Sequence, residues 1–407
     1  MIKGKKIMIF FKNKHILVVV TGGIAAYKSA ILVRSLIKKG GNVRVAMTKS
    51  AENFVTPLTF STLTKHTVLT DIFKANDGSV DHVAWARWAD FIFVVPATAN
   101  FVAKMAHGIA DDTASTLLLA SPAEKVIAPS MNDQMWNNPA TVRNIKQLDT
   151  DGILIIEPTT GFLAEGYDGK GRLPESDDIL EQAQIRLLAK NGKLKNKNVL
   201  ITAGGTKEAL DPLRYITNRS SGKMGYALAQ AAVEAGAVVT LISTVERRLP
   251  FGSKLIKVTD AREMLDTVLE HFDKTDIFIS AAAVSDFRPA KQSNQKIKKN
   301  GNQGLKVELV QNPDILATVG AKKTGQFVVG FAAETENIVE YAKNKLVKKH
   351  ADMIVANEVG HPDSGFNVDN NRVIIFRPKQ AQKEFPLQSK IDTARSIIEE
   401  IIKSVFE

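Results

Sequence analysis

Short apolar runs rich in β-branched residues alternate with helical stretches along most of this chain, and this alternation constrains the fold most strongly. Parallel strands need long, usually helical connections, so helices come to cover both faces of the sheet. The pattern predicts an α/β protein with two Rossmann-like domains and mainly parallel sheets. The expected strands are 15–20, 42–47, 91–95, 125–128 and 153–156, then 199–202, 238–242, 277–280, 327–329, 353–355 and 373–376, with a helix over 24–39.

A polar, basic segment separates the two halves. Residues 189–198, AKNGKLKNKN, contain few large apolar side chains, as expected of a linker or a domain edge. At about 150 residues per domain, a chain of 407 residues suffices for two or three domains. We therefore expect one domain over residues 1–190 and a second over residues 191–407.

The composition excludes several classes of protein. Apolar residues make up 44% and charged residues 24%, which excludes a wholly disordered chain, a collagen and a coiled coil. No apolar run approaches the roughly 18 residues that cross a bilayer, so we expect neither a membrane span nor a signal peptide. The chain has no cysteine, which removes disulfides and thiolate chemistry together and fits a cytoplasmic protein.

The net charge of +11 could serve nucleic acid, an acidic membrane surface or phosphorylated small molecules. The basic residues are spread along the chain, without a long basic tail, zinc-finger spacing or RNA-binding motif. We therefore expect small-molecule partners, with no nucleic acid and no membrane. Any single lysine cluster could equally be a solvated surface.

A glycine turn follows the first expected strand. Gly22 and Gly23 lie between this strand and a helical segment, where backbone N–H groups can approach a phosphate closely. The pattern G-x-G-x-x-G is absent, and no acidic residue about 20 positions later could hold a ribose, so a mononucleotide such as FMN fits better than a dinucleotide. Such a turn also occurs without any ligand.

Small and hydroxylated residues follow two further strands, in PATAN (96–100) and PSMN (129–132), and they permit close approach to a flat ring. Asn132 could donate to a substrate carboxylate, and His82 could act as an acid or base near neutral pH. Alternatively, Asn132 caps a turn, and His82 lies at the surface or serves packing. The candidate cofactor-binding residues are Gly22, Gly23, Thr48, Pro96, Ala97, Thr98 and Asn100.

The second half begins with a passage that can supply many phosphate donors, ITAGGTKEALDPLRYITNRSSGKMG (201–225). It is not a Walker A loop, because Met224 follows Gly222-Lys223 and Thr217 occupies the position of the first glycine. A P-loop ATPase or kinase is therefore disfavoured. Further along, Lys345 and Lys349 lie four residues apart on an expected helix, where they repel each other unless an anion lies between them.

Five motifs in the first half carry a resemblance: GGIAAYK (22–28), PATAN (96–100), GIADD (108–112), APSMNDQMW (128–136) and GFLAEGYDGKGRL (161–173). Over roughly the first 180 residues the chain resembles the homo-oligomeric flavin-containing cysteine decarboxylases. The resemblance implies their fold, bound FMN, a trimer-based assembly and decarboxylation of a cysteine carboxylate. It also implies that His82 and Asn132 serve the decarboxylation.

The motifs of the second half are AAAVSDFRPA (281–290), KIKK (296–299), NPDIL (312–316), GFAAET (330–335) and FNVDNN (366–371). Residues 197–407 resemble phosphopantothenate cysteine ligase. The two resemblances in this order are typical of the bifunctional coenzyme A biosynthesis family. A flavoprotein that only regulates a partner is the competing interpretation, and the complete ligase half counts against it.

The resemblance implies that CTP activates 4′-phosphopantothenate as an acyl cytidylate, that L-cysteine displaces CMP, and that FMN-dependent decarboxylation gives 4′-phosphopantetheine. It places Asn218 in turnover of the acyl intermediate and Asp286 near Mg²⁺ or Mn²⁺. It also implies a homo-oligomer built from trimers of the first domain and dimers of the second. The candidate nucleotide-binding residues are Ala281, Ala282, Asp286, Lys296, Pro313, Asp314, Ile315, Leu316, Phe331, Lys345 and Lys349.

One position departs from the family pattern. The coenzyme A branch usually carries a cysteine where this chain has Glu165, and that cysteine is held to protonate the enethiolate as reduced flavin returns its hydride. Three outcomes stay open: Glu165 supplies the proton, water or another residue does, or the reaction stops at the enethiol. We favour Glu165, because desolvation beneath a substrate-covering flap can raise the pKa of a carboxylic acid.

Overall fold

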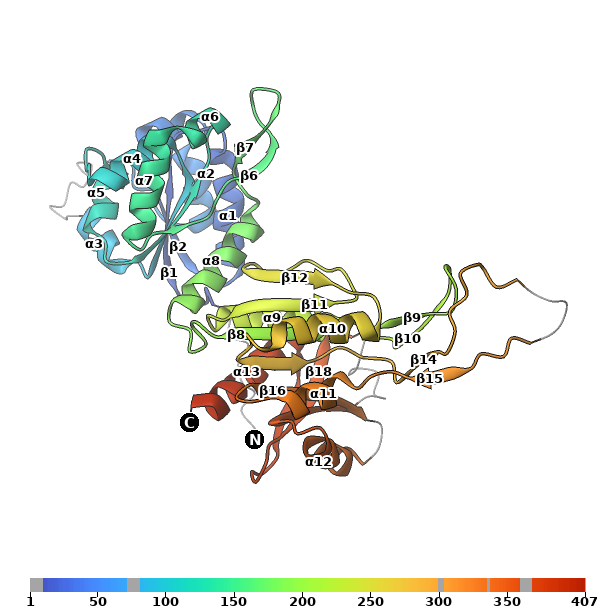
Figure 1. Ribbon diagram of the computed structural model, residues 1–407. Helices are drawn as coiled ribbons and strands as arrows, with labels where there is room; N and C mark the ends of the chain where they lie inside the picture. Colours follow the sequence, from blue (N-terminus) through green and yellow to red (C-terminus); the bar gives the residue numbers. More distant parts are fainter. Residues whose placement is uncertain (1–9, 72–80, 299–303, 335–336, 359–367, 407) are drawn as a thin grey trace. The chain divides into compact units, whose positions relative to one another are not determined.

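The structure is a computed structural model that describes residues 10–71, 81–298, 304–334, 337–358 and 368–406 (Figure 1). Lys299, Thr335, Phe366 and Asn367 of the quoted motifs lie outside these ranges. The chain divides into two compact units, residues 1–184 and residues 185–407, and the division falls within helix α8 (Ser176–Lys190). The domain bounds 1–190 and 191–407 stay a prediction.

A five-stranded parallel sheet forms the centre of the first unit, with strand order β2-β1-β3-β4-β5. The α/β class with a parallel sheet is confirmed. Residues 16–20, which belong to β1, are completely buried, because helices cover both faces of the sheet. The strands are β1 (His15–Val20), β2 (Asn42–Met47), β3 (Phe91–Ala97), β4 (Glu124–Pro129) and β5 (Leu154–Ile155).

The helices of this unit begin at local capping signals. Asp112 and Ser115 form a reciprocal capping box, and Thr98 accepts a hydrogen bond from the Phe101 amide. An antiparallel hairpin, β6 (Thr159–Phe162) and β7 (Asp168–Arg172), lies outside the sheet. The helices are α1 (Ala26–Lys38), η1 (Lys49–Asn53), α2 (Pro57–Thr64), α3 (Asp81–Trp88), α4 (Ala99–His107), α5 (Thr113–Ala120), α6 (Asp133–Asn137) and α7 (Pro139–Thr150).

The second unit contains an eight-stranded sheet in the order β12-β11-β8-β13-β16-β17-β18-β19. Its strands pair in parallel from β12 to β17, and β18 and β19 continue antiparallel. The apolar pattern did not predict β12 and β19, because both are edge strands with many polar residues. The strands are β8 (Asn198–Ala203), β11 (Val238–Ser243), β12 (Ser253–Lys257), β13 (Ile277–Ser280), β16 (Phe327–Glu334), β17 (Met353–Glu358), β18 (Asn370–Phe376) and β19 (Lys383–Ser389).

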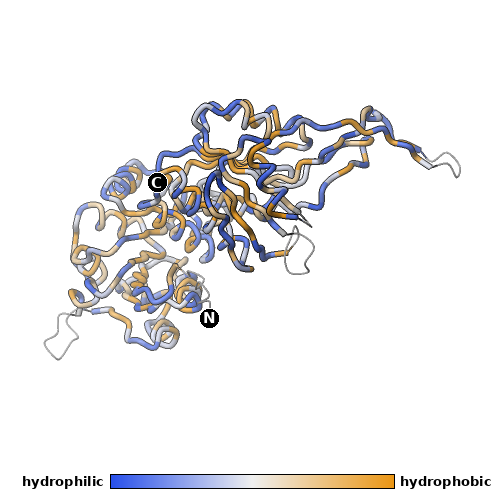
Figure 2. The backbone as a smooth tube through the Cα atoms, turned by 90° about the horizontal axis from the view of Figure 1, so that it is seen from below, coloured by the Kyte–Doolittle hydropathy of each residue, from blue (hydrophilic) through white to orange (hydrophobic). Residues whose placement is uncertain are grey.

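Two separate cores cover the two faces of this sheet. On one face, α9 (Lys223–Glu234) and α13 (Lys390–Phe406) contribute buried apolar side chains to a single core. On the other, α10 (Ala261–Phe272), α11 (Ile315–Lys322) and α12 (Ile338–Lys348) contribute to a second core. The apolar segments gather in the interior of the unit (Figure 2).

Two small antiparallel ribbons extend from the second unit (Figure 1). One pairs β9 (Lys207–Ala209) with β10 (Tyr215–Thr217), and the other pairs β14 (Phe287–Pro289) with β15 (Leu309–Gln311). Within the described residues, no helix combines the length and apolar character required to span a bilayer.

Candidate active sites

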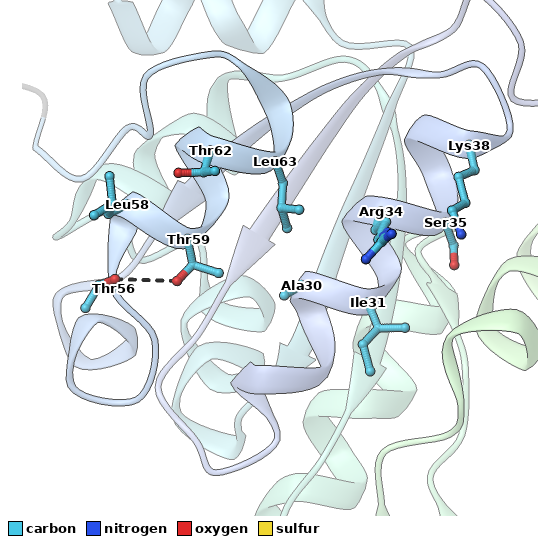
Figure 3. A pocket seen from close by; sticks show the side chains of 10 residues that line it. All are labelled: Ala30, Ile31, Arg34, Ser35, Lys38, Thr56, Leu58, Thr59, Thr62 and Leu63. Atoms are coloured by element: carbon cyan, nitrogen blue, oxygen red, sulfur yellow. Dashed lines mark hydrogen bonds between the residues drawn. The ribbon is translucent and has the colours of Figure 1, made fainter.

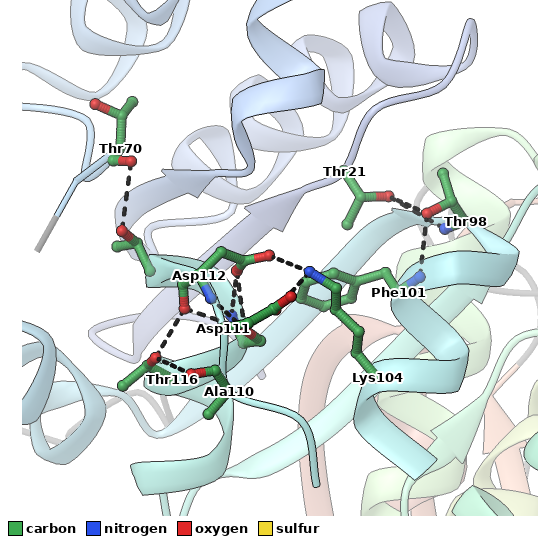
Figure 4. Close-up of polar contacts among 11 residues, drawn as sticks. Thr21, Thr70, Thr98, Phe101, Lys104, Ala110, Asp111, Asp112 and Thr116 are labelled. Carbon is green, nitrogen blue, oxygen red and sulfur yellow. Dashed lines mark hydrogen bonds and ion pairs between the residues drawn. The ribbon is translucent and has the colours of Figure 1, made fainter. Parts of the chain in front are cut away.

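The carboxyl ends of three neighbouring strands bring the predicted cofactor residues of the first unit together. Thr21, directly before the glycine pair, accepts a hydrogen bond from the Thr98 amide over 3.1 Å and donates to the Pro96 carbonyl over 2.7 Å. These contacts join the ends of β1 and β3, which Figure 4 shows at Thr21 and Thr98. The chain leaves the sheet toward opposite sides at β1 and β3, and such a switch point is where open α/β sheets bind FMN.

The two predicted glycines have different local requirements. A Cβ atom on Gly22 would lie 2.4 Å from Ser50 Cβ, so this glycine is required for close packing on η1. A Cβ on Gly23 would meet Thr98 Cγ2 at an ordinary 3.5 Å. Packing therefore accounts for the first glycine, and phosphate binding at both stays a prediction.

Thr48 shows that the residues present fit a ligand at these strand ends. It follows β2, its side chain is buried, and its hydroxyl oxygen has no hydrogen-bond partner among the described residues. Buried hydroxyl groups are nearly always paired in native proteins, so an unpaired one indicates a missing partner. Ala97 is buried beside this region, whereas Asn100 is exposed in the first turn of α4.

The GIADD motif has a structural role in this chain. Lys104 forms ion pairs with Asp111 over 2.6 Å and with Asp112 over 2.8 Å (Figure 4). Burial opposes ionisation of Asp112, but the hydrogen bonds from Lys104 and Ser115 outweigh it and lower the pKa of the carboxyl group. This network fixes the connection between α4 and α5.

The hairpin of β6 and β7, called the flap from here on, brings two of the predicted catalytic residues into contact. Asn132 caps α6 through its side-chain oxygen, which accepts from the Gln134 amide over 2.8 Å. Its side-chain nitrogen donates to Glu165 Oε1 over 3.0 Å and to Tyr167 Oη over 2.9 Å. The capping alternative for Asn132 is therefore correct, and the same amide also faces the flap.

Tyr167 and Asp133 belong to this network, although the sequence did not predict them as site residues. The Tyr167 hydroxyl donates to Asp133 Oδ1 over 2.6 Å. This bond lowers the pKa of Asp133 and raises the pKa of Tyr167. Both residues lie in motifs quoted from the sequence, Asp133 in 128–136 and Tyr167 in 161–173. Their contact was not predictable, because only the fold brings the two motifs together.

The glycines of this flap serve a close approach and a turn. A Cβ on Gly171 would lie 2.0 Å from the Met131 carbonyl oxygen, where the Met131 amide donates to Gly171 O over 3.1 Å. Gly166 has φ of 93°, in the left-handed region that favours glycine. The base of the hairpin is thus held against the segment that carries Asn132.

His82 lies on α3, which supplies none of the residues of this network. It is the second residue of α3 and is half-buried. Among the described residues it makes no hydrogen bond with Asn132 or Glu165. A catalytic role for His82 therefore stays a prediction.

A pocket of about 1090 Å³ in the second unit contains all the predicted nucleotide-binding residues except Lys296. It lies at the carboxyl ends of the parallel strands, where open α/β sheets bind ligands. Its wall includes Asn218 and the predicted residues Ala281, Ala282, Asp286, Pro313, Asp314, Ile315, Leu316, Phe331, Lys345 and Lys349.

Lys296 is placed outside this pocket. Its side chain is exposed, on the segment after β14. The neighbouring Ile297 is bound by Asp211, which accepts from its amide over 3.0 Å, and by Arg214, which donates to its carbonyl over 2.7 Å. Lys296 does not line the pocket that the other predicted nucleotide-binding residues share. Binding of a nucleotide phosphate by Lys296 therefore stays a prediction.

Asn218 and Asp286 border the loop that follows β13. The Asn218 amide donates to the Val284 carbonyl over 3.1 Å, and the Asp286 carbonyl accepts from the Asn312 amide over 2.8 Å. The part of the chain that the structure describes has no group of three or more His, Cys, Asp or Glu side chains that could hold a metal ion. A metal contact of Asp286 therefore stays a prediction, which requires Mg²⁺ to take its other ligands from water and substrate phosphates.

The two predicted lysines of α12 have protein partners. Lys345 donates to the Phe331 carbonyl over 2.7 Å, and Lys349 forms an ion pair with Asp314. Burial opposes ionisation of Asp314, but the Lys349 contact outweighs it and lowers the pKa of the carboxyl group. The Asp314 carboxylate thus supplies the negative charge that the sequence expectation assigned to a bound anion, and phosphate binding by these lysines stays a prediction.

Two further polar side chains in this pocket escaped the sequence analysis. Ser285 and Asn357 are buried, and the Ser285 hydroxyl and the Asn357 amide oxygen have no partner among the described residues. Neither follows a glycine-rich turn, so local sequence gave no signal for them. Both fit a ligand with its own hydrogen-bonding groups.

A second pocket, of about 860 Å³, lies between α1 and α2 of the first unit (Figure 3). It contains none of the predicted site residues. Its wall consists of Ala30, Ile31, Arg34, Ser35, Lys38, Thr56, Leu58, Thr59, Thr62 and Leu63.

Comparison with known proteins covers both units. Residues 11–188 match the family model described as Flavoprotein, and residues 194–405 match the DNA/pantothenate metabolism flavoprotein C-terminal domain. The coenzyme A biosynthesis bifunctional protein CoaBC of Bacillus subtilis (strain 168) is 48% identical over 393 residues, or 96% of this chain and 97% of that protein. The corresponding protein of Escherichia coli (strain K12) is 42% identical over 395 residues, or 96% and 97%.

Among solved structures, the C-terminal domain of a coenzyme A biosynthesis bifunctional protein CoaBC is 39% identical to this chain, with a TM-score of 0.46. The similarity covers 53% of this chain and 98% of that domain.

Proposed function

This chain belongs to the family of bifunctional coenzyme A biosynthesis proteins, and we propose that its ligase part joins 4′-phosphopantothenate to L-cysteine using CTP before its flavoprotein part decarboxylates the product using FMN. Family membership follows from identity of 48% across nearly the whole chain. The chain is accordingly a bifunctional enzyme of coenzyme A biosynthesis, with a flavoprotein decarboxylase part and a ligase part.

For FMN, the supporting observation is the switch point between β1 and β3, with the unpaired Thr48 hydroxyl close by in the fold. Gly22, Gly23 and Thr98 would hold the phosphate, and Thr48 would supply a hydrogen bond. FMN supplies oxidation and reduction of the cysteine moiety when it is bound. The residues present fit this group, because they combine small size with free hydrogen-bonding capacity.

In the decarboxylase part, Asn132 would bind the substrate carboxylate. Its amide already donates to a carboxylate oxygen, that of Glu165, over 3.0 Å. Substrate entry would therefore require Glu165 to give up this contact. Glu165 would then protonate the enethiolate carbon as the hydride returns, and the resulting carboxylate would regain a proton from solvent.

In the ligase part, the supporting observation is the single pocket that gathers Asn218, Asp286 and the predicted nucleotide residues. Asp286 would bind Mg²⁺ together with the CTP phosphates, and Lys345 and Lys349 would neutralise their charge. Asn218 would orient the acyl carbonyl as the cysteine amine attacks and CMP leaves. The cationic chain lowers the cost of bringing two phosphorylated substrates together.

The proposal includes a homo-oligomer with trimers of the first domain and dimers of the second, acting in the cytoplasm. Sedimentation of the full chain would measure the assembly. The number of chains in the assembly should be divisible by both three and two. Any other number of chains would contradict this arrangement.

One coupled experiment tests the chemistry. Purified protein should show flavin absorption bands at about 370 and 450 nm. It should also release pyrophosphate with CTP and 4′-phosphopantothenate, and form the acyl-cysteine product only when cysteine is added. Repeated preparations without flavin would contradict the decarboxylase proposal, and release of pyrophosphate with ATP but not CTP would contradict the nucleotide assignment.

A further inference from the structure

An arginine of the edge strand β2 lies against two tryptophans of α3. The Arg44 guanidinium carbon is 5.0 Å from the ring centroid of Trp85 and 4.5 Å from that of Trp88. His15, the first residue of β1, stacks on Trp88 with ring centroids 4.6 Å apart and an interplanar angle of 24°. All four side chains are half-buried, and none of them was a candidate in the sequence analysis.

Helix α3 also carries His82, the predicted acid or base of the decarboxylation. Residues three and four apart share one face of a helix, so His82 lies on a face with Trp85, and Trp85 lies on a face with Trp88. Ala86 and Ala89 are buried on this side of the helix, in the core of the first unit. A rotation of α3 about its axis would therefore move the Trp85 ring and the His82 imidazole together.

The other anchors of α3 lie toward its carboxyl end. Asp90, two residues after the helix, accepts a hydrogen bond from the His15 amide over 2.8 Å. Ser121 Oγ donates to the Ala86 carbonyl over 2.7 Å. Because Arg44 contacts Trp85 as well as Trp88, it extends these anchors by one turn toward His82.

The strand that carries Arg44 also leads to the predicted cofactor site. Side chains alternate along a strand, so Arg44 and Ala46 lie on the same face of β2, and Ala46 is buried in the same core as Ala86. Thr48, whose hydroxyl is unpaired among the described residues, directly follows β2. One short strand thus holds both the helix of His82 and the hydroxyl that is predicted to bind the cofactor.

Arginine suits this contact chemically. A guanidinium group is planar, stacks on aromatic faces and is more weakly hydrated than an ammonium group, so it can be half-buried against the rings. Its attraction to the face of an indole ring depends on direction, whereas apolar packing does not. A methionine in its place would fill space without fixing the angle of the helix.

We propose that Arg44 is a positioning residue for His82, because its contacts with Trp85 and Trp88 fix the rotation of α3 and thereby the direction of the imidazole. Arg44 would act through the helix, without touching the substrate. The inference rests on the proposed decarboxylase function and on the predicted role of His82.

Single-turnover reduction of the flavin tests this role in the full-length chain loaded with FMN. With 4′-phosphopantothenoylcysteine as substrate, the flavin of Arg44→Met should be reduced about tenfold more slowly than that of the parent, a part of the roughly 10²- to 10⁴-fold that a positioned acid or base contributes. The substrate concentration for the half-maximal rate should change little. Arg44→Lys keeps a cation over the rings and should lose less. The matched control is Arg143→Met on the exposed surface of α7, which should match the parent.

A double-mutant cycle separates positioning from a general loss of stability. If Arg44 acts through His82, Arg44→Met should have no further effect on flavin reduction in a His82→Asn background. An equal loss in both backgrounds would overturn the proposal, because the arginine would then act independently of the histidine. Reduction at the parental rate by His82→Asn alone would overturn it too, since no acid–base role would then need positioning.

Chemical modification gives a readout that requires no activity. Diethyl pyrocarbonate acylates accessible, neutral imidazole nitrogens, and mass analysis of peptides measures the rate at each histidine. In Arg44→Met the rate at His82 should change several-fold, because α3 can then rotate, and the rate at the exposed His107 of α4 should stay the same. An unchanged rate at His82 would contradict a positioning role.

The proposed function and the positioning role can fail separately. If the substrate does not reduce the flavin of the parent, the proposed decarboxylase function is wrong, while the modification rate still tests the position of His82. If the parent is active and Arg44→Met matches it in both measurements, only the positioning role is wrong. If Arg44→Met does not fold, Trp85→Leu decides by the same measurements, because it removes the ring contact nearest to His82 and leaves that of Trp88.

Discussion

The side-chain nitrogen of Asn132 donates a hydrogen bond to Glu165 Oε1 over 3.0 Å, so the predicted proton donor lies against a predicted catalytic amide. Glu165 is exposed in this arrangement, so its desolvation by a closed flap and its role as proton donor stay predictions. The contact also means that the amide binds the flap carboxylate whenever no substrate carboxylate is present.

Glu165→Gln should decarboxylate the substrate yet accumulate reduced flavin and the enethiol product, because glutamine cannot supply the proton. Stopped-flow absorption at the flavin bands and mass analysis of the product would measure both. Asp168→Asn on the same hairpin is the matched control. Full formation of 4′-phosphopantetheine by Glu165→Gln would exclude Glu165, and enethiol from the parent would show that the final reduction is absent.

Tyr167→Phe should raise the KM of the decarboxylation several-fold, because the flap loses its bonds to Asp133 and Asn132. The pKa of Asp133 should rise toward its ordinary value, since the Tyr167 hydrogen bond lowers it. Steady-state kinetics would measure the KM, and an NMR titration of the Asp133 carboxyl group would measure its pKa. The control Tyr341→Phe should match the parent, and an unchanged KM for Tyr167→Phe would show that this network does not hold the flap.

Asn218→Asp should trap the acyl cytidylate. The change replaces an amide that donates to the Val284 carbonyl with a carboxylate that repels it, so amine attack should slow by about a hundredfold or more. Pyrophosphate release should continue for one turnover, as rapid quench and mass analysis would show. Turnover at the parental rate would contradict the role, and Asn294→Asp in an exposed loop serves as the control.

Glu400→Gln should destabilise the second unit by about 1 to 3 kcal/mol at pH 7. The Glu400 side chain is 2% exposed and pairs with Arg377, Lys383 and Lys403 over 3.0, 2.6 and 3.0 Å. Burial would raise its pKa, but the bonds from Lys383 and Lys403 lower it below 4.5.

The pH dependence of this effect has a definite sign. Because the folded-state pKa is lowered, the stabilisation by Glu400 is present above the unfolded-state value of 4.5 and is lost as pH falls through the folded-state value. Calorimetric unfolding of parent and variant should therefore converge in acid. The control is Glu399→Gln at the exposed neighbouring position, which should lower the free energy of unfolding by less than about 0.5 kcal/mol. A constant difference at all pH values would contradict the ion-pair explanation.

The two activities should be separable, with flavin bound by a fragment that ends near Lys190 and ligation by one that starts near Lys193. The ligating fragment should be more stable if it starts at Ser176, because Ile185 is 1% exposed in the core of the second unit. We expect a difference of about 2 to 5 kcal/mol in the free energy of unfolding. Urea denaturation of both fragments measures it, and equal stability would show that Ile185 contributes nothing there.

The sequence alone determined the α/β class and most of the strands. Residues 16–20 are apolar throughout because their strand is buried on both faces, and that requirement is visible in a short local run. The glycine turn after this strand and the motifs around Asn132 and Asn218 are likewise local, so they could be identified without the fold.

Only the tertiary structure decided which distant residues meet. It joined Tyr167 to Asp133, left Lys296 outside the ligase pocket and placed Lys390 in its wall. It also revealed the edge strands β12 and β19, whose polar residues show no strong apolar pattern. The physical reason is that burial, pKa and hydrogen bonding depend on neighbours far apart in the chain, whereas a strand or a turn depends mainly on residues adjacent to it.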